Sequence, residues 1–338
     1  MSKAPLLEVK KLRTHFYSEN GRVTAVDGIE FEVHEGEILG IVGESGCGKS
    51  VTSQSVLRLY DEKHEVEYEG EINFKGMNLL ELSLSKMQNI RGNEISMIFQ
   101  DPLSSLNPVY TIGYQIAESI ILHQEVSKKE ANEKAVEVLR LTGIPAPEKR
   151  VNEYPHQLSG GMRQRVMIAM TLACQPKLLI ADEPTTALDV TIQAQILDLI
   201  VEMQTKFKMG VMFITHDLGV VAEICTRVVV MYLGQIIEEA NVESLFENPL
   251  HPYTKGLMRS VPQIDGDRSQ ELYVIEGTVP SLDNVPKGCR FSTRCQYADE
   301  KCYEQEPELR SLKDTQKVRC WYAEKIIKMG DDTYVKSS

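Results

Sequence analysis

The chain has 338 residues, of which 42% are hydrophobic and 25% are charged, a composition typical of a globular protein and not of a disordered one. Lysine and arginine total 37 against 49 aspartates and glutamates, so the formal net charge of -12 argues against nucleic-acid binding. The sequence contains neither the run of roughly 20 apolar residues that a membrane-spanning helix needs nor a signal peptide, so we expect a cytosolic chain.

The N-terminal region predicts strands that lead into a helix. Residues 6–16, 23–33 and 37–43 have β-like patterns and are separated by glycine-containing turns. The last of these strands runs into the sequence GESGCGKS and then into a helical stretch at residues 50–60. A further β-like stretch, EINFKG, follows at residues 71–76. We therefore expect a strand, a glycine-rich loop and a helix in direct succession.

Residues 105–175 predict a mostly helical region. Ser127 and Glu130 fit a capping box at the start of one helix, and Gly143 marks its expected end. Between them the sequence carries an apolar stripe, which consists of Ala131, Ala135, Val138 and Leu139.

After residue 175, buried strands alternate with an amphipathic helix. KLLIADE at residues 177–183 and GVMFITH at residues 210–216 predict strands. Residues 191–207 predict a helix between them, with apolar side chains at helical spacing at Ile192, Ile196, Leu199, Met203 and Phe207. This alternation predicts an α/β fold with a largely parallel sheet. From residue 248 the sequence becomes proline-rich and irregular, so we place a domain boundary there.

The glycine-rich loop carries the first chemical signal. Residues 43–50 fit the pattern G-x-x-x-x-G-K-[ST], in which backbone N–H groups at a helix N-terminus surround phosphates. Lys49 would reach the β- and γ-phosphates of ATP, and the Ser50 hydroxyl would bind Mg²⁺. The pattern alone leaves kinases, GTPases and motor ATPases open. The candidate nucleotide-binding residues of this loop are Gly43, Ser45, Gly46, Cys47, Gly48, Lys49, Ser50 and Val51.

Two carboxylates at the end of residues 177–183 narrow the choice. Asp182 closes an apolar run and would lie beside Mg²⁺, whereas Glu183 would polarise the attacking water. Acidic residues at a strand end are commonly surface residues, but the phosphate-binding pattern upstream favours the catalytic interpretation. We therefore predict an ATPase in which Glu183 is the catalytic carboxylate.

Further short strings surround these carboxylates: SMIFQDP, LSGGMRQRV, ALD and FITHD. In this order and spacing they resemble the Q-loop, signature motif, D-loop and switch histidine of the ABC ATPases. Singly, each would be read as an ordinary turn or strand end. Their characteristic residues are Gln100, Ser159, Gly160, Gly161, Ala187, Leu188, Asp189 and His216.

The resemblance to ABC ATPases implies a fold and a mechanism. Residues 1–247 would form a cassette with a RecA-like parallel-sheet core, an antiparallel β subdomain and a helical signature subdomain at residues 105–175. Two cassettes would close head to tail over two ATP molecules, so Ser159, Gly160, Gly161 and Asp189 would act in the partner's site. The resemblance further implies that Phe16 stacks on adenine, that Ser50, Gln100 and Asp182 hold Mg²⁺, and that the catalytic residues are Lys49, Gln100, Glu183 and His216.

Three other strings resemble the importers of oligopeptides, dipeptides and nickel. They are DPLSSLNPVYTIG at residues 101–113, HPYTKGLMRSVP at residues 251–262 and GCRFSTRC at residues 288–295. The resemblance implies a D-type subunit in which residues 248–338 form the oligopeptide/dipeptide transporter C-terminal domain. The first string would contact the coupling helices of the membrane subunits. The implied cargo is an oligopeptide or dipeptide, with nickel or another small solute as the alternative.

The same resemblance implies an assembly at the cytoplasmic face of a bacterial membrane. The partners would be a second ABC ATPase subunit (an F-type paralogue or an identical copy), two integral membrane permeases and, indirectly, an extracytoplasmic peptide-binding protein. One rival is a soluble ABC ATPase acting on ribosomes or DNA, which would have two fused cassettes or long coiled-coil insertions, and neither is found. The other rival, an iron–sulfur electron carrier with a vestigial nucleotide fold, would not retain every ATP-side motif.

Four of the seven cysteines gather near the C-terminus. Cys289, Cys295, Cys302 and Cys320 have the spacing C-x5-C-x6-C-x17-C. Four thiolates in a short irregular domain predict a structural metal site. Four-Cys ligation suits a [4Fe-4S] cluster, whereas zinc sites usually begin with closer cysteine pairs. The family resemblance implies the [4Fe-4S] cluster, with zinc or unligated thiols as the alternatives.

Overall fold

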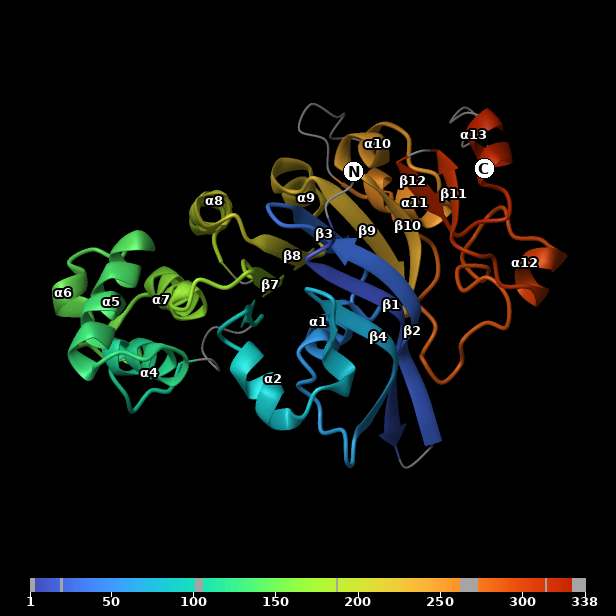
Figure 1. Ribbon diagram of the computed structural model, residues 1–338. Helices are drawn as coiled ribbons and strands as arrows, with labels where there is room; N and C mark the ends of the chain where they lie inside the picture. Colours follow the sequence, from blue (N-terminus) through green and yellow to red (C-terminus); the bar gives the residue numbers. More distant parts are fainter. Residues whose placement is uncertain are drawn as a thin grey trace. The chain divides into compact units, whose positions relative to one another are not determined.

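The computed structural model describes residues 4–18, 21–100, 106–186, 188–261, 273–313 and 315–329 (Figure 1). These residues form two compact units, and each unit is built from separate stretches of the chain. The first unit comprises the described residues of Met1–Glu8, Glu32–Ile38 and Asn73–Ile214. The second comprises those of Val9–Phe31, Leu39–Ile72 and Thr215–Ser338. No described helix is both long enough and apolar enough to cross a bilayer.

The first unit contains parallel strands in the order β6, β7 and β8. β6 (Ile95–Ile98) pairs with β7 (Leu178–Asp182), and β7 pairs with β8 (Gly210–Thr215). All residues of these strands are buried, which explains why their sequences are continuous apolar runs. α8 (Val190–Phe207) connects β7 to β8. The predicted strand–helix–strand alternation is confirmed.

The helical part of the first unit is drawn in green in Figure 1 and consists of α4 (Ile112–His123), α5 (Lys128–Leu141), α6 (Pro147–Arg150) and α7 (Gly160–Leu172). The capping box is confirmed, because the Ser127 hydroxyl accepts from Glu130 N at 3.3 Å and the Glu130 carboxylate accepts from Ser127 N at 2.8 Å. The helices share a buried apolar core, which includes Ile112, Ile116, Ile120, Ala131, Ala135, Leu139, Val166 and Ala169.

The second unit contains the strand that precedes the glycine-rich loop. β3 (Ile38–Val42) pairs in parallel with β9 (Arg227–Tyr232), and β9 pairs with β10 (Gln235–Asn241) in antiparallel fashion. β10 continues antiparallel to β12 (Gln316–Val318), which pairs with β11 (Arg310–Lys313). The region beyond residue 248, which the sequence predicts to be irregular, therefore adds strands to the β3 sheet. These strands are too short to produce a recognisable alternating pattern.

The predicted β-rich N-terminal region is also confirmed. β1 (Leu7–Ser18) lies between β2 (Gly21–Val33) and β4 (Val66–Phe74). The other described elements are α1 (Lys49–Val56), β5 (Met77–Asn78), α2 (Leu84–Ile90), α9 (Leu218–Ile224), α10 (Val242–Glu247), α11 (Pro252–Arg259), α12 (Glu300–Glu304), α13 (Ala323–Met329) and two single turns, η1 (Leu79–Glu81) and η2 (Pro155–Gln157).

Candidate functional site

The loop between β3 and α1 requires glycine at two positions. Gly43 and Gly48 have φ values of 153° and 102°, which residues with a Cβ rarely adopt. A Cβ on Gly43 would lie 2.3 Å from the backbone oxygen of Met231, and one on Gly48 would lie 2.8 Å from that of Ala25. The loop therefore packs directly against backbone of its own unit, and these glycines determine its path.

Lys49 is the first residue of α1, and its side chain turns back into this loop. The Lys49 Nζ donates to the backbone oxygen of Gly43 at 2.7 Å and to that of Glu44 at 3.1 Å, and the residue is 5% exposed. The loop thus holds an ammonium group at a helix N-terminus, where N–H groups and the helix dipole favour an anion. Burial raises the pKa of the neighbouring Cys47 thiol, which leaves it uncharged near neutral pH.

The two predicted carboxylates lie at the end of β7 in the first unit. Asp182 is the last residue of the strand and is 3% exposed. Glu183 leaves the strand with a φ of 47°, and its N–H donates to Ile214 O at 2.9 Å. A left-handed conformation at a residue other than glycine costs about 1–3 kcal/mol and clusters at functional sites. The hydrogen bond to β8 holds the Glu183 backbone in place directly after the strand.

Gln100 and Glu183, which the family resemblance places among the catalytic residues, contact each other directly. Glu183 Oε2 accepts from Gln100 Nε2 at 3.1 Å and from the Thr186 hydroxyl at 2.9 Å. The Gln164 side-chain amide also donates to Pro184 O, which ties α7 to the residue that follows Glu183. Two polar donors thus fix one oxygen of the carboxylate, a suitable arrangement for a group that positions water.

The signature residues begin α7. The Ser159 hydroxyl accepts from Met162 N at 3.4 Å and caps the helix, and both Ser159 and Gly160 are exposed. A Cβ on Gly161 would lie 3.2 Å from Ile192 Cγ2 of α8, so this glycine permits close packing of the two helices. Asp189 caps α8, because its Oδ1 accepts from Ile192 N at 2.9 Å. Ala187, residues 101–105 and Pro262 lie outside the described residues.

His216 and Phe16 belong to the second unit. His216 follows β8 directly and is exposed, and the next residue, Asp217, caps α9 by accepting from Gly219 N at 2.8 Å. Phe16 lies in β1, where its ring contacts Tyr60 edge-on at a centroid distance of 4.9 Å. The predicted stacking of Phe16 on adenine stays a prediction.

Four thiols line one small cavity in the second unit. Cys289, Cys295, Cys302 and Cys320 surround a space of about 20 Å³ together with Phe291 and other apolar groups. Burial raises the pKa of Cys289 to about 11 and those of Cys295 and Cys320 to about 12, so these thiols are protonated at neutral pH. Among the described residues, no three His, Cys, Asp or Glu side chains are placed to hold a metal ion. The predicted metal site is therefore not confirmed: the sulfur donors share one cavity, but its size admits no more than a water molecule.

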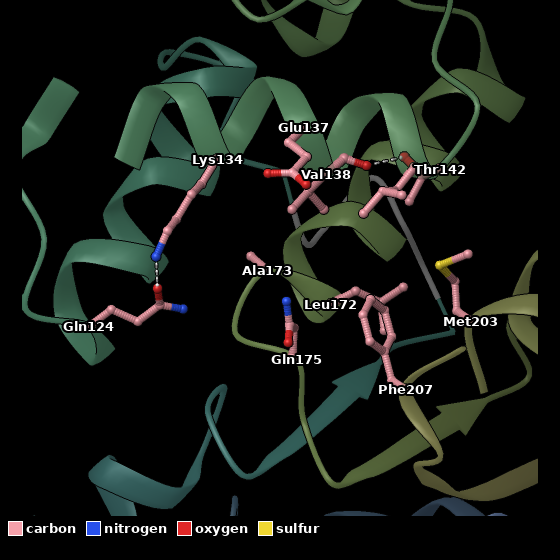
Figure 2. Close-up of a pocket in the computed structure, with 11 residues that line it drawn as sticks. Gln124, Lys134, Glu137, Val138, Thr142, Leu172, Ala173, Gln175, Met203 and Phe207 are labelled. Atoms are coloured by element: carbon pink, nitrogen blue, oxygen red, sulfur yellow. Dashed lines mark hydrogen bonds between the residues drawn. The ribbon is translucent and has the colours of Figure 1, made fainter. Parts of the chain in front are cut away.

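A second cavity, of about 100 Å³, lies between α5, the C-terminal end of α7 and α8 (Figure 2). Lys134 reaches across from α5 and donates to Gln124, while Leu172 and Phe207 contribute apolar surface. None of the residues predicted to bind nucleotide or metal lines this cavity.

A family model for ABC transporters matches residues 26–186, and one for the oligopeptide/dipeptide transporter C-terminal region matches residues 237–302. The probable peptide ABC transporter ATP-binding protein y4tR of Sinorhizobium fredii is 55% identical over 324 residues, which cover 96% of this chain and 97% of that protein. The oligopeptide transport ATP-binding protein OppD of Bacillus subtilis is 54% identical over 316 residues, or 94% of this chain and 88% of that protein. This chain belongs to the ATP-binding proteins of peptide ABC transporters.

The dimeric structure of a bacterial ABC transporter cassette has the same fold. It matches with a TM-score of 0.62 at 27% identity, over 70% of this chain and 98% of that chain. The predicted ABC cassette fold is therefore confirmed, and ATP is the expected ligand of this family.

The sequence did not indicate several residues that hydrogen-bond to the motifs predicted to bind and hydrolyse ATP. Thr186 and Gln164 hold the segment around Glu183, and their polar side chains carry no pattern that distinguishes them from surface residues. In the second unit, Tyr253 and Arg294 both bind Glu44 of the glycine-rich loop. Tyr253 belongs to the HPY string, but nothing in the spacing of that string indicates a contact more than 200 residues away.

Proposed function

We propose that this chain hydrolyses Mg-ATP and that hydrolysis powers the import of oligopeptides or dipeptides. The observation that carries the catalytic part is the Glu183 carboxylate, which is held by Gln100 and Thr186 at the end of a buried strand. The peptide part is supported by relatives named for peptide and oligopeptide transport, which match nearly the whole chain. The matched C-terminal family model supports the same cargo class.

In the proposed reaction, the loop at residues 43–50 binds the phosphates. The Lys49 ammonium would exchange its contacts with Gly43 O and Glu44 O for the β- and γ-phosphate oxygens. Ser50, Gln100 and Asp182 would hold Mg²⁺, which neutralises phosphate charge when bound.

Glu183 would orient a water molecule for in-line attack on the γ-phosphorus and accept its proton. The bond from the γ-phosphorus to the bridging oxygen breaks, and ADP leaves with that oxygen. His216, exposed after β8, is the second side chain that we propose for the γ-phosphate.

The exposed signature residues support a site shared between two cassettes. Ser159 caps α7 and Gly160 is its first residue, and both residues are exposed, which suits a helix N-terminus that receives the γ-phosphate of a partner chain. We propose that Gly161 and Asp189 complete this surface. The second cassette would be an F-type paralogue or an identical copy.

We propose that the working assembly is an importer at the cytoplasmic face of the membrane. Two integral permeases would carry the peptide, an extracytoplasmic binding protein would deliver it, and this chain would dock on the permeases as a peripheral subunit. Residues 1–247 would supply the cassette, with its helical subdomain at residues 105–175. Residues 248–338 would supply the family-specific C-terminal domain.

The first test is the ATPase activity of Glu183→Gln in the full-length protein. Because general-base groups contribute about 10²–10⁴-fold, we expect hydrolysis to fall by at least about 100-fold while ATP binding persists. The variant should accumulate as an ATP-dependent dimer in size-exclusion chromatography. Glu202→Gln, on the exposed face of α8, is the matched control. Hydrolysis by Glu183→Gln at the parent rate would overturn the catalytic assignment.

We also propose that Cys289, Cys295, Cys302 and Cys320 hold a [4Fe-4S] cluster, with zinc as the alternative. The support is that all four thiols line one cavity. Binding would require the thiols to lose their protons and the cavity to widen, so the cluster would act as a structural staple. Iron and acid-labile sulfide are measured after anaerobic purification, with Cys174→Ser as the control. About four irons per chain, lost in Cys295→Ser, support the cluster. Zinc supports the alternative, and the absence of metal refutes both.

A further inference from the structure

Two side chains from the C-terminal region bind one residue of the glycine-rich loop. The Glu44 N–H donates to the Tyr253 hydroxyl at 2.8 Å. The Glu44 carboxylate accepts from both terminal nitrogens of Arg294, at 2.7 and 3.1 Å. Lys49 Nζ donates to the carbonyl oxygen of the same Glu44. Tyr253 and Arg294 therefore both hold Glu44, the residue whose carbonyl oxygen accepts a hydrogen bond from Lys49.

The Arg294 side chain is excluded from solvent and is held by further hydrogen bonds. It is only 3% exposed, whereas the side chain of Glu44 is 30% exposed. The guanidinium also donates to Ile275 O at 3.2 Å and to Glu276 O at 3.1 Å. Its central carbon lies 5.8 Å from the centre of the Tyr232 ring. A bidentate pair with so little freedom is pre-organised, and removing one partner leaves a poorly solvated charge.

The His-Pro-Tyr segment, residues 251–253, places the Tyr253 side chain against the loop. Pro252 occupies the first turn of α11, and the His251 Nδ1 accepts from Tyr253 N at 3.0 Å. The Tyr253 ring is fully buried and packs edge-on against Phe291 at 5.5 Å. This segment therefore behaves as a rigid support whose hydroxyl accepts the Glu44 N–H.

A carboxylate on a phosphate-binding loop needs a counter-charge. The ionised Glu44 side chain repels a polyphosphate, and the repulsion persists where solvent is partly excluded. Arg294 cancels that charge by a bidentate pair and holds the side chain in one direction. We propose that Arg294 is a positioning residue for ATP binding, which neutralises Glu44 and, with Tyr253, fixes the loop backbone that Lys49 contacts. The proposal rests on the proposed role of residues 43–50 in binding the phosphates.

The test is a double-mutant cycle in the full-length protein, read out as the dissociation constant of a fluorescent ATP analogue and as KM and kcat. We expect Arg294→Met to raise the dissociation constant and KM about tenfold with little change in kcat. The interaction that is lost would stabilise bound ATP and the transition state equally, so its removal affects binding and not the chemical step. Glu44→Gln should lower the dissociation constant two- to threefold. The double variant should return to within about threefold of the parent, because the two changes compensate.

Several controls separate a charge effect from a folding effect. Arg310 forms a bidentate but exposed ion pair with Glu324 in the same C-terminal region, at 2.6 Å, and it does not contact the glycine-rich loop, so Arg310→Met should bind ATP like the parent. Arg294→Lys keeps the charge without the bidentate geometry and should restore part of the affinity. If Arg294→Met does not fold, Tyr253→Phe keeps the ring, removes the acceptor of the Glu44 N–H, and should raise the dissociation constant severalfold.

Two results would overturn the inference. One is parent-like ATP affinity in Arg294→Met. The other is a double variant that binds as weakly as Arg294→Met, because Arg294 would then act only through the fold of the C-terminal region. Lys49→Ala reports on the underlying assignment independently. If that variant still bound and hydrolysed ATP like the parent, the proposed role of the loop would fail whatever Arg294→Met does.

Discussion

Glu238 is a buried carboxylate that should make the stability of the second unit depend on pH. It lies on β10 and accepts from Leu250 N at 2.7 Å and from His251 N at 2.8 Å, so it holds the start of the His-Pro-Tyr segment. Burial outweighs these hydrogen bonds and raises its pKa from 4.5 to about 7. We predict that Glu238→Gln will remove a pH-dependent penalty from folding.

The magnitude follows from linkage between protonation and folding. Below the unfolded-state pKa of Glu238 the carboxyl is protonated in both states and the penalty is absent. As pH rises from 4.5 to about 7 the unfolded state ionises first, so the folded state loses stability, and above that range the loss is constant. At 1.36 kcal/mol per pKa unit, the loss amounts to about 3 kcal/mol at pH 8.

Glu238→Gln also lowers the free energy of unfolding by an amount that does not depend on pH. A glutamine side chain offers one acceptor oxygen, so either Leu250 N or His251 N loses its partner at a cost of about 1–3 kcal/mol. His251 itself has a pKa lowered to about 3 by burial, which costs stability as pH falls below 6.5. That effect is present in both proteins and cancels from their difference.

The assay is urea unfolding at pH 5 and pH 8, followed by the fluorescence of Trp321, the single tryptophan. The free energy of unfolding of Glu238→Gln should be below that of the parent at pH 5, where the parent already carries a small part of the penalty. Between pH 5 and pH 8 the difference should move in favour of the variant by about 2.5 kcal/mol. Glu243→Gln, exposed on α10, should differ from the parent equally at both pH values. If the free energies of unfolding of Glu238→Gln and the parent differed by the same amount at pH 5 and pH 8, the reasoning would be refuted.

Three further predictions concern the two units separately. Ser127→Ala removes the α5 cap and should lower the free energy of unfolding by about 1 kcal/mol, measured by chemical unfolding, with ATP affinity unchanged. Gly43→Ala places a Cβ 2.3 Å from Met231 O and should weaken ATP binding at least tenfold in a titration; parent-like binding would contradict the close packing of the loop. Thr186→Val removes the hydroxyl bound to Glu183 Oε2 and should lower kcat about tenfold at constant KM, whereas a purely raised KM would show that Thr186 does not orient the carboxylate.

The sequence predicted those parts of the site whose functional residues lie next to one another along the chain. The glycine-rich loop is one continuous segment, and its motif predicts a helix directly after the last glycine, where α1 begins at Lys49. The Glu183 carboxylate follows a strand whose apolar run is visible by itself. Gln100 lies 83 positions from Glu183, and only the family resemblance, which names both as catalytic residues, related them before the structure showed their contact.

The parts that were missed depend on contacts between distant residues. Arg294 and Glu44 are separated by 250 positions, and neither carries a local pattern that selects the other. Glu238 and Glu239 are buried in β10, although two adjacent glutamates in a strand would ordinarily indicate a solvated edge. β12 has three residues, too few for a hydrophobic period, so its pairing with β10 could not be predicted.

The pairing of β12 with β10 has a practical consequence for anyone who shortens this gene. Glu238, Glu239 and Ala240 are in register with Val318, Lys317 and Gln316. A product that stopped at residue 247 would leave that side of β10 without its neighbour, and an uncovered strand edge recruits strands from other chains. Residues 248–338 are therefore unsuited to removal or exchange as a module, and a chain that ends at residue 247 should be recovered mainly from inclusion bodies.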